Sequence, residues 1–234
     1  MSAGSILFPN PPLQALLENH AHLAKRSGKA MKYPREVTPF AAIEENSPHA
    51  FESLFELMEP GEVTYIISDT HPAVFPGLQY DPPLGVLQMA YPRELALPEA
   101  PGSESVTLEP IPCIEAEDMV ALTDIAFPGF FRRRTCEMGS YYGIRDAGRL
   151  VAMCGERMAI GDYRELSGLC THPEYRGRGY APILMVRLMQ NHRAAGLRSY
   201  LHVAANNTNA IALYEKMGFE HRGEFQLYRV TRQV

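Results

Sequence analysis

The sequence predicts an α/β (α+β) protein with a mixed, partly parallel sheet flanked by helices. From residue 105 onward, strand-like stretches alternate with stretches of helical periodicity, and such alternation implies parallel connections. Of the 234 residues, 46% are apolar and 21% are charged. This is the balance of an ordinary globular protein, and the chain is long enough to bury a real core.

The second half carries the clearest elements. A hairpin over 141–160 turns at Asp146-Ala147-Gly148, and acidic residues lie at the start of a predicted helix, where the helix dipole favours them. Gly196 ends another helix, and Pro182 falls in its first turn, where the missing N–H costs little. Strands are predicted over 106–111, 163–171, 198–205 and 218–230, and helices over 114–127, 179–196 and 208–217.

The first half is also mixed α and β, but it shows little obvious chemistry. A helix is predicted over 12–28, with an apolar face, basic residues in its last turn and Gly28 as its stop. Ser47 as N-cap and Pro48 as first residue predict a second helix. Strands are predicted over 36–43, 61–68 and 84–91.

A boundary between two domains is predicted at residues 99–105, "EAPGSES", which are small, polar and turn-forming. The predicted organisation is therefore an N-terminal α/β domain over 1–98, this linker, and a second domain over 106–234.

Composition excludes several classes of function. The net charge of −5 is a poor match to nucleic-acid binding, which needs a basic surface. No apolar run is long enough for a membrane span, and the N-terminus lacks the features of a signal peptide. The four cysteines show no CxxC pair, so we expect reduced thiols and a cytoplasmic protein.

The stretch "HPEYRGRGYAPILM" (172–185) has the features of an anion-binding loop. It follows a predicted strand and opens a predicted helix, where free backbone N–H groups and the helix dipole attract an anion. Gly177 and Gly179 allow close approach and positive φ, while Arg176 and Arg178 add cationic donors. The stretch lacks the Gly-Lys-Ser/Thr of a P-loop and the third glycine of a dinucleotide fingerprint. Taken alone, it is equally a basic turn.

A second stretch makes a family resemblance specific. "RGRGYA" (176–181) resembles the CoA-binding loop of the GNAT superfamily of acyl-CoA-dependent N-acyltransferases, and "NNTNAIALYEKMGF" (206–219) resembles its second signature. The two occur in the expected order, with a helix and a strand between them. The resemblance covers about 105–234 and is closest in style to the branch containing glycine N-acyltransferases. It implies a GNAT-type sheet, with a first half that is either a regulatory domain or a degenerate GNAT-like unit.

The resemblance also implies a binding site for acetyl-CoA (or another acyl-CoA) as co-substrate. The loop would bind the pyrophosphate, the strand before it would pair with the pantetheine arm, and Asn207, or Asn206 one position earlier, would touch that arm. An amide of the same strand could also stabilise the oxyanion. The residues implied are Leu169, Cys170, Thr171, Arg176, Gly177, Arg178, Gly179, Tyr180, Ala181 and Asn207.

Two residues are the expected catalytic groups. Tyr214 matches the tyrosine that protonates the departing thiolate, with simple packing as the alternative. Glu165 lies on the motif strand at the spacing of a glutamate base; we expect it on the same face as Leu169, with a raised pKa. A surface ion pair with Arg164 or Arg157 is the alternative, and Glu156 is the reserve base.

Other residues are weaker candidates. Arg132, Arg133 or Arg134 could hold an acceptor carboxylate, although a solvated basic turn is the favoured interpretation. Cys170 is not expected to act as a nucleophile, and no histidine has metal-ligand spacing, so no metal is expected.

The sequence therefore predicts an N-acetyltransferase that moves an acetyl group directly from acetyl-CoA to a primary amine of a small molecule or amino acid. The alternative is a non-catalytic acyl-CoA sensor or regulatory module. Neither nucleic acid nor membrane is an expected partner, and both a monomer and a homodimer remain open.

Overall fold

The computed structural model describes residues 6–99, 102 and 105–234. Its helices are α1 (Pro11–Leu17), α2 (Pro48–Leu57), α3 (Ala116–Ala126), α4 (Tyr180–Ala194) and α5 (Thr208–Lys216). Its strands are β1 (Lys25–Ser27), β2 (Ala30–Lys32), β3 (Ala41–Ile43), β4 (Val63–Ile67), β5 (Leu78–Tyr80), β6 (Leu84–Ala90), β7 (Glu109–Pro110), β8 (Tyr141–Asp146), β9 (Arg149–Ile160), β10 (Tyr163–Thr171), β11 (Arg198–Ala204) and β12 (Glu220–Arg232). Short 3₁₀ turns lie at Ala21–Leu23, Cys113–Glu115, Thr135–Met138 and Pro173–Tyr175.

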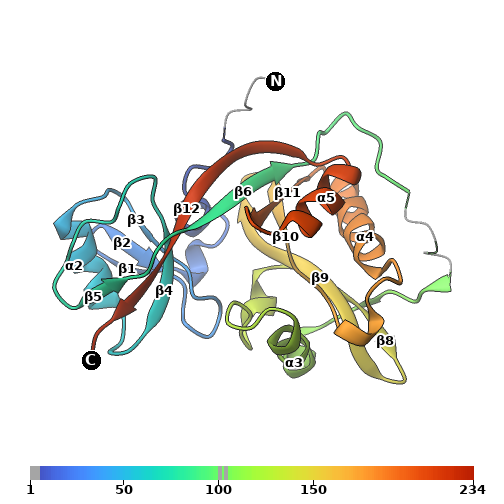
Figure 1. Cartoon of the computed structure of the whole chain (residues 1–234), viewed down its shortest axis with the longest axis horizontal. Coiled ribbons are helices and arrows are strands. Elements are labelled where there is room, and N and C mark those ends of the chain that lie inside the picture. Colours follow the sequence, from blue (N-terminus) through green and yellow to red (C-terminus); the bar gives the residue numbers. More distant parts are fainter. Residues whose placement is uncertain (1–5, 100–101, 103–104) are drawn as a thin grey trace.

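One sheet connects two lobes, in the strand order β4-β12-β6-β11-β10-β9-β8-β7, with β5 also paired to β12 (Figure 1). β12 runs through both lobes: its first part pairs with β6, and its last part pairs with β4 and β5. β10 and β11 are parallel, whereas the other pairs in this sheet are antiparallel. The predicted mixed, partly parallel sheet is confirmed.

The sheet crosses the predicted domain boundary. β6 comes from the first half of the chain, yet it lies between β11 and β12 and pairs with both. Of the predicted linker 99–105, residues 100, 101, 103 and 104 lie outside the described residues. The division into two domains therefore stays a prediction, and the strands on either side of it share one sheet.

The helices cover both faces of this sheet. α4 packs on β9, β10 and β11 from one side, and α3 packs on β9 and β10. Two neighbours on β9 show the alternation: Cys154 packs into the apolar cluster that includes α4, and Met153 into the cluster that includes α3. The loop before α4 begins at the carboxyl end of β10.

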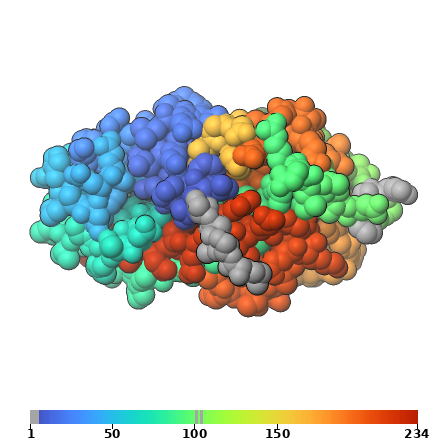
Figure 2. Space-filling view, turned by 90° about the horizontal axis from the view of Figure 1, so that it is seen from above, coloured from blue at the N-terminus to red at the C-terminus, as the bar shows by residue number. Residues whose placement is uncertain are grey.

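The N-terminal segment crosses the junction of the lobes, where Figure 2 shows it in dark blue against yellow and red segments. The ring of Phe8 packs edge-on to Tyr163 at 5.1 Å and to Tyr200 at 5.2 Å. The Glu18 carboxylate accepts a hydrogen bond from the Gly161 amide at 2.8 Å. Phe8 and Glu18 therefore help to fix β10 and β11.

Local signals explain several of these elements. The Ser47 hydroxyl accepts a hydrogen bond from the Ala50 amide at 3.2 Å and caps α2, as predicted. The β8–β9 hairpin turns through Ala147 and Gly148, both with positive φ, which confirms the predicted turn.

The long helix predicted over 12–28 is wrong. α1 ends at Leu17, and Lys25–Ser27 forms β1, which pairs with β2 through a turn at Gly28 (φ +43°). A seven-residue helix is marginal by itself, so the pairing of β1 with β2 overrides the helical periodicity after residue 18.

The expectation of four reduced cysteines is also wrong. Cys113 and Cys136 form a disulfide, with their Cα atoms 5.5 Å apart, and it joins the turn before α3 to the Thr135–Met138 turn. Cys154 and Cys170 are free and buried. The two bonded cysteines are 23 residues apart, so only the tertiary fold brings them together. Among the described residues, none of the helices has the length and apolar character to cross a bilayer.

Candidate active site

The glycine loop joins β10 to α4. Gly177 and Gly179 have φ of +78° and +75°. Apart from the glycine itself and its two chain neighbours, no described residue has a heavy atom within 4 Å of the position where a Cβ would stand on either one. Gly179 is the N-cap of α4, and among the described residues no side chain caps its N-terminus. The first N–H groups of α4 are therefore left for a ligand, as an anion site requires.

The two arginines of this loop are exposed, and contacts with neighbouring groups fix their side chains. The Nε of Arg176 donates to the carbonyl oxygen of Thr171 at 3.4 Å. The guanidinium of Arg178 lies 4.7 Å above the ring of Tyr175, whose hydroxyl donates to Asp146 at 2.6 Å. These contacts leave the charges of both arginines beside the loop, where they favour an anion.

β10 and β11 separate next to this loop. They pair in parallel only from Tyr163–Arg198 to Leu166–Leu201, and beyond that point both strands continue without pairing to each other. On the other side of β10, its register with β9 shifts between Ser167 and Cys170, where Gly168 has φ +62°. The gap exposes the main chain of β10 to a cleft.

That cleft has a volume of about 650 Å³. It extends from the glycine loop, past the separated strands, to side chains of the first lobe. The lining includes every residue predicted to bind acetyl-CoA, together with Tyr214: Leu169, Cys170, Thr171, Arg176, Gly177, Arg178, Gly179, Tyr180, Ala181 and Asn207. The sequence motifs thus meet on one surface. Within the described residues, no cluster of three potential metal ligands occurs.

Asn207 and Tyr214 lie on α5. The Oδ1 of Asn207 accepts a hydrogen bond from the Ala210 amide at 3.2 Å and caps the helix, so the cap uses the carbonyl oxygen and not the amide nitrogen. The ring of Tyr214 lies 6.2 Å from that of Phe219, and its hydroxyl has no hydrogen-bond partner within residues 6–99, 102 and 105–234. Burial raises the pKa of Tyr214, which keeps its proton on the phenol.

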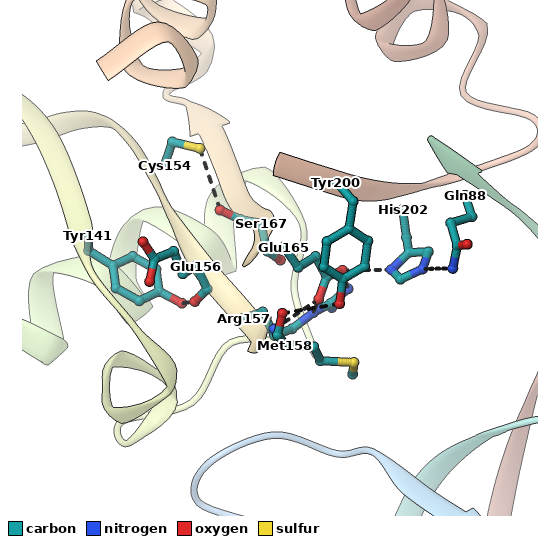
Figure 3. Close-up of polar contacts among 10 residues, drawn as sticks. All are labelled: Gln88, Tyr141, Cys154, Glu156, Arg157, Met158, Glu165, Ser167, Tyr200 and His202. Atoms are coloured by element: carbon teal, nitrogen blue, oxygen red, sulfur yellow. Dashed lines mark hydrogen bonds and ion pairs between the residues drawn. The ribbon is translucent and has the colours of Figure 1, made fainter. Parts of the chain in front are cut away.

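Glu165 lies outside the lining of the cleft and is fully buried. Its carboxylate accepts hydrogen bonds from the Nε of Arg157 at 3.0 Å and the Met158 amide at 3.1 Å, and it lies 2.8 Å from the Nδ1 of His202 (Figure 3). Burial by itself would raise the pKa of Glu165, but Arg157 and then His202 hold that pKa well below its ordinary range. The raised pKa predicted from the sequence is therefore wrong.

The predicted face of Glu165 is also wrong. Leu166 and Leu169, three residues apart, both pack into the cluster that includes α4, because the irregularity at Gly168 inserts a residue into the alternation. Glu165 therefore points to the face opposite Leu169. The ion pair with Arg157, weighed as the alternative, is present, but in the interior and not at the surface.

Glu156, the reserve base, is also engaged away from the cleft. It accepts a hydrogen bond from the Ser140 amide at 3.2 Å and lies 2.9 Å from the Nε2 of His192, whose Nδ1 is 2.8 Å from the Ser199 hydroxyl. Burial raises the pKa of Glu156, but the hydrogen bond and charge of His192 outweigh it and lower that pKa.

His202 is the residue of this site that the sequence reasoning missed. It lines the cleft from β11 and connects Glu165 to Gln88 (Figure 3). The Oε1 of Gln88 accepts from the amides of Leu7 and Phe8, and its Nε2 donates to the Phe8 carbonyl at 3.2 Å. The Nε2 of Gln88 is therefore also the donor toward the Nε2 of His202, 3.1 Å away, so His202 donates from Nδ1 to Glu165.

This network occupies both nitrogens of His202. The partners of His202 lie at positions 88 and 165, far away in the sequence. The one sequence feature that could have indicated this network is therefore the position of His202 on the strand before the second signature. The network can position β11, Arg157 and the N-terminal segment against one another. It offers no free lone pair to the cleft.

The three consecutive arginines face other surfaces. Arg133 pairs with Glu117, Arg134 pairs with Glu137 at 2.7 Å, and none of the residues 132–134 lines the cleft. The geometry supports the solvated basic turn. From the same loop, Phe127 and Phe130 reach the cleft instead. Burial raises the pKa of the Cys170 thiol to about 12, which makes it a poor nucleophile.

A split parallel strand pair that leads into a glycine-rich loop and a helix N-terminus is the arrangement that the resemblance to the GNAT superfamily implies. A model of the acetyltransferase (GNAT) family matches residues 107–219, and the chain belongs to this family. It is 31% identical over 126 residues to the N-alpha-acetyltransferase RimI of Mycobacterium tuberculosis, an alignment that spans 51% of this chain and 78% of the relative.

Solved structures extend the similarity to the first half. A GNAT-family protein from Novosphingobium aromaticivorans is 30% identical and superposes with a TM-score of 0.84, covering 97% of this chain and 98% of that one. A GCN5-related N-acetyltransferase from Kribbella flavida is 16% identical and superposes with a TM-score of 0.60, covering 94% of this chain and 93% of that one. A tandem GNAT protein from the clavulanic acid biosynthesis pathway is 13% identical and superposes with a TM-score of 0.54, covering 84% of this chain and 76% of that one. The last two show the fold alone. The resemblance to the glycine N-acyltransferase branch stays a prediction.

Proposed function

We propose that this protein transfers the acetyl group of acetyl-CoA directly to a primary amine of a small molecule or amino acid. The observation that carries the proposal is that one cleft joins the glycine loop at the N-terminus of α4, the separated strands and Tyr214. Direct transfer needs both substrates in one site, and the cleft has room on both sides of the strand split.

The loop suits the pyrophosphate of CoA. The open space above Gly177 and Gly179, the free N–H groups of α4, and the charges of Arg176 and Arg178 all favour a phosphate group there. The main chain of Leu169, Cys170 and Thr171 would pair with the pantetheine arm, and the Asn207 amide nitrogen would contact the same arm. A main-chain amide of β10 would also stabilise the oxyanion.

In the proposed reaction, the amine nitrogen attacks the thioester carbonyl carbon. The new C–N bond forms, the C–S bond breaks, and the departing thiolate takes the proton of the Tyr214 hydroxyl. Solvent water returns a proton to the Tyr214 phenolate before the next turnover. Solvent water takes the proton that the amine loses, because neither Glu165 nor Glu156 lines the cleft and the nitrogens of His202 are both engaged. We therefore assign Glu165 a positioning role, through Arg157 and His202.

A second candidate acceptor is the α-amine of a protein N-terminus. The relative from M. tuberculosis, which matches the family region of this chain, is an N-alpha-acetyltransferase. The α-amine of an amino acid and that of a peptide differ only beyond the reacting nitrogen. The two acceptors are therefore compared in one assay.

The test is release of free CoA thiol from acetyl-CoA with amino acids, simple amines and short peptides. Tyr214→Phe should lower kcat by about 10²-fold or more and leave the Kd for CoA within about twofold, because it removes a proton donor and keeps the ring. Tyr142→Phe is the matched control, since the Tyr142 hydroxyl bonds Asn191 and lies outside the cleft.

Wild-type turnover in Tyr214→Phe would refute the acid role. If calorimetry shows that CoA binds, but no amine causes release of free thiol from acetyl-CoA, the protein would instead be a non-catalytic acyl-CoA sensor.

A further inference from the structure

The end of the cleft away from the glycine loop is apolar and comes from segments far apart in the sequence. Phe40 and Ile67 belong to the first lobe, and Phe127 and Phe130 to the loop after α3. β12 adds two more side chains. We call this set the apolar end of the cleft: Phe40, Ile67, Phe127, Phe130, Phe225 and Leu227.

Phe130 is held in place by two other rings. It stacks on Phe40 with 6.0 Å between the ring centroids, and it packs against Tyr65 at 4.7 Å. Phe40 is buried, with the Arg157 guanidinium 4.8 Å from its ring centre. Phe130 itself is only half-buried, so an apolar surface that its neighbours have already ordered faces the cleft.

The charges at this end do not suit a second ammonium group. Over the part of the chain that the structure describes, no aspartate or glutamate lines the cleft. Arg157 lines the cleft beside Phe40, and its partner Glu165 is buried behind it. A diamine or polyamine would bring a positive charge into an apolar site without a counter-ion, at a high desolvation cost.

We propose, on the basis of the proposed function, that the acceptor is a monoamine with an aromatic or branched aliphatic body that fills the apolar end. The arrangement of the cleft assigns this end to the acceptor. The glycine loop and the separated strands form the CoA side, and the apolar end is contributed by the first lobe, the loop after α3 and β12. A body that displaces water from ordered rings gains affinity without an ordering cost.

Two amines of similar length test the proposal. With acetyl-CoA fixed, kcat/KM for 2-phenylethylamine should exceed that for 1,4-diaminobutane by at least about tenfold, and ethylamine serves as the reference without an apolar body. Phe130→Ala should lower kcat/KM for 2-phenylethylamine about tenfold and leave ethylamine within about twofold. Phe130→Leu should restore most of the loss.

The matched control is Ile125→Ala, on α3 but outside the cleft, where the side chain is 50% exposed. It should leave kcat/KM unchanged for both 2-phenylethylamine and ethylamine. Unfolding midpoints of each variant separate a folding defect from a loss of recognition.

Three results would overturn the proposal: preference for the diamine, equal losses for both monoamines in Phe130→Ala, or a Phe130-dependent preference for octanoyl-CoA over acetyl-CoA. The last would assign the apolar end to the acyl chain. Absence of thiol release with every amine would instead overturn the proposed function, and the present proposal with it.

Discussion

The two ends of the cleft are built in different ways. The glycine loop is a continuous run of residues, it is exposed, and it offers main-chain groups at positive φ. The other end consists of side chains from four distant segments. Arg157 and His202 also line the cleft, and Glu165 is buried behind them. A phosphate site can therefore lie within a dozen residues of sequence, whereas the acceptor site exists only after the whole chain has folded.

The largest expected effect is at the buried network. Glu165→Gln should lower the free energy of unfolding by about 3–5 kcal/mol, because the fully buried carboxylate of Glu165 is the ion-pair partner of the half-buried Arg157 guanidinium. Urea unfolding monitored by fluorescence and circular dichroism measures the change.

The control for this change is Glu137→Gln, which breaks an exposed ion pair with Arg134 whose side chains are 37% and 47% accessible. It should cost less than about 1 kcal/mol. If the two variants lose the same free energy of unfolding, the buried network does not stabilise the acceptor side.

A substitution in the glycine loop should weaken ligand binding as well as stability. In Gly179→Ala, a Cβ at φ +75° costs about 1–2 kcal/mol and occupies the space proposed for the phosphate, so the Kd for CoA should rise roughly tenfold. Calorimetry with CoA measures the Kd.

Gly148→Ala provides the comparison, since Gly148 also has positive φ (+82°) and open space but lies in the β8–β9 turn. Its stability loss should be similar and its Kd for CoA unchanged. A normal Kd in Gly179→Ala would show that the phosphates bind elsewhere.

The smallest expected effect is a pH dependence near the acceptor side. His20 is buried, with its Nδ1 2.9 Å from the Tyr33 hydroxyl. Burial, followed by the charges of His22 and Arg164, lowers its pKa from 6.5 to about 4. The unfolded chain therefore binds a proton on His20 between these values, whereas the folded chain does not. This contribution to stability is complete above pH 6.5 and decreases as the pH falls toward 4.

Between pH 7 and pH 5, the unfolding free energy should therefore fall by on the order of 1 kcal/mol, and His20→Gln should flatten that slope. Substitution of the exposed His49 by Gln should leave the slope as in the wild type. A slope that His20→Gln does not change would remove His20 as its cause.

Much of the fold and of the CoA side could be predicted from the sequence, because the signals there are local. Ser47 caps its helix, the β8–β9 hairpin turns where a glycine permits it, and Asn207 and Tyr214 follow the second signature onto α5. Each of these features depends on neighbours in the sequence, so a pattern of a few residues specifies it.

The acceptor side could not be predicted in the same way. Alternation along β10 placed Glu165 on the wrong face, because the extra residue at Gly168 resets the register and does not show in the pattern. The pKa of Glu165 depends on Arg157 and His202, and the orientation of His202 depends on Gln88. The Cys113–Cys136 disulfide is likewise a tertiary pairing.

The position of β6 between β11 and β12 has a consequence for how the chain folds. Both neighbours of β6 lie far along the sequence, so both of its edges stay unpaired until the end of the described chain is available. Closing such distant pairings is slow, and open strand edges favour aggregation in the meantime. We therefore expect slow refolding that competes with aggregation at high protein concentration. A fragment limited to residues 107–219 would lack the strand that covers β11, and should fold poorly without it.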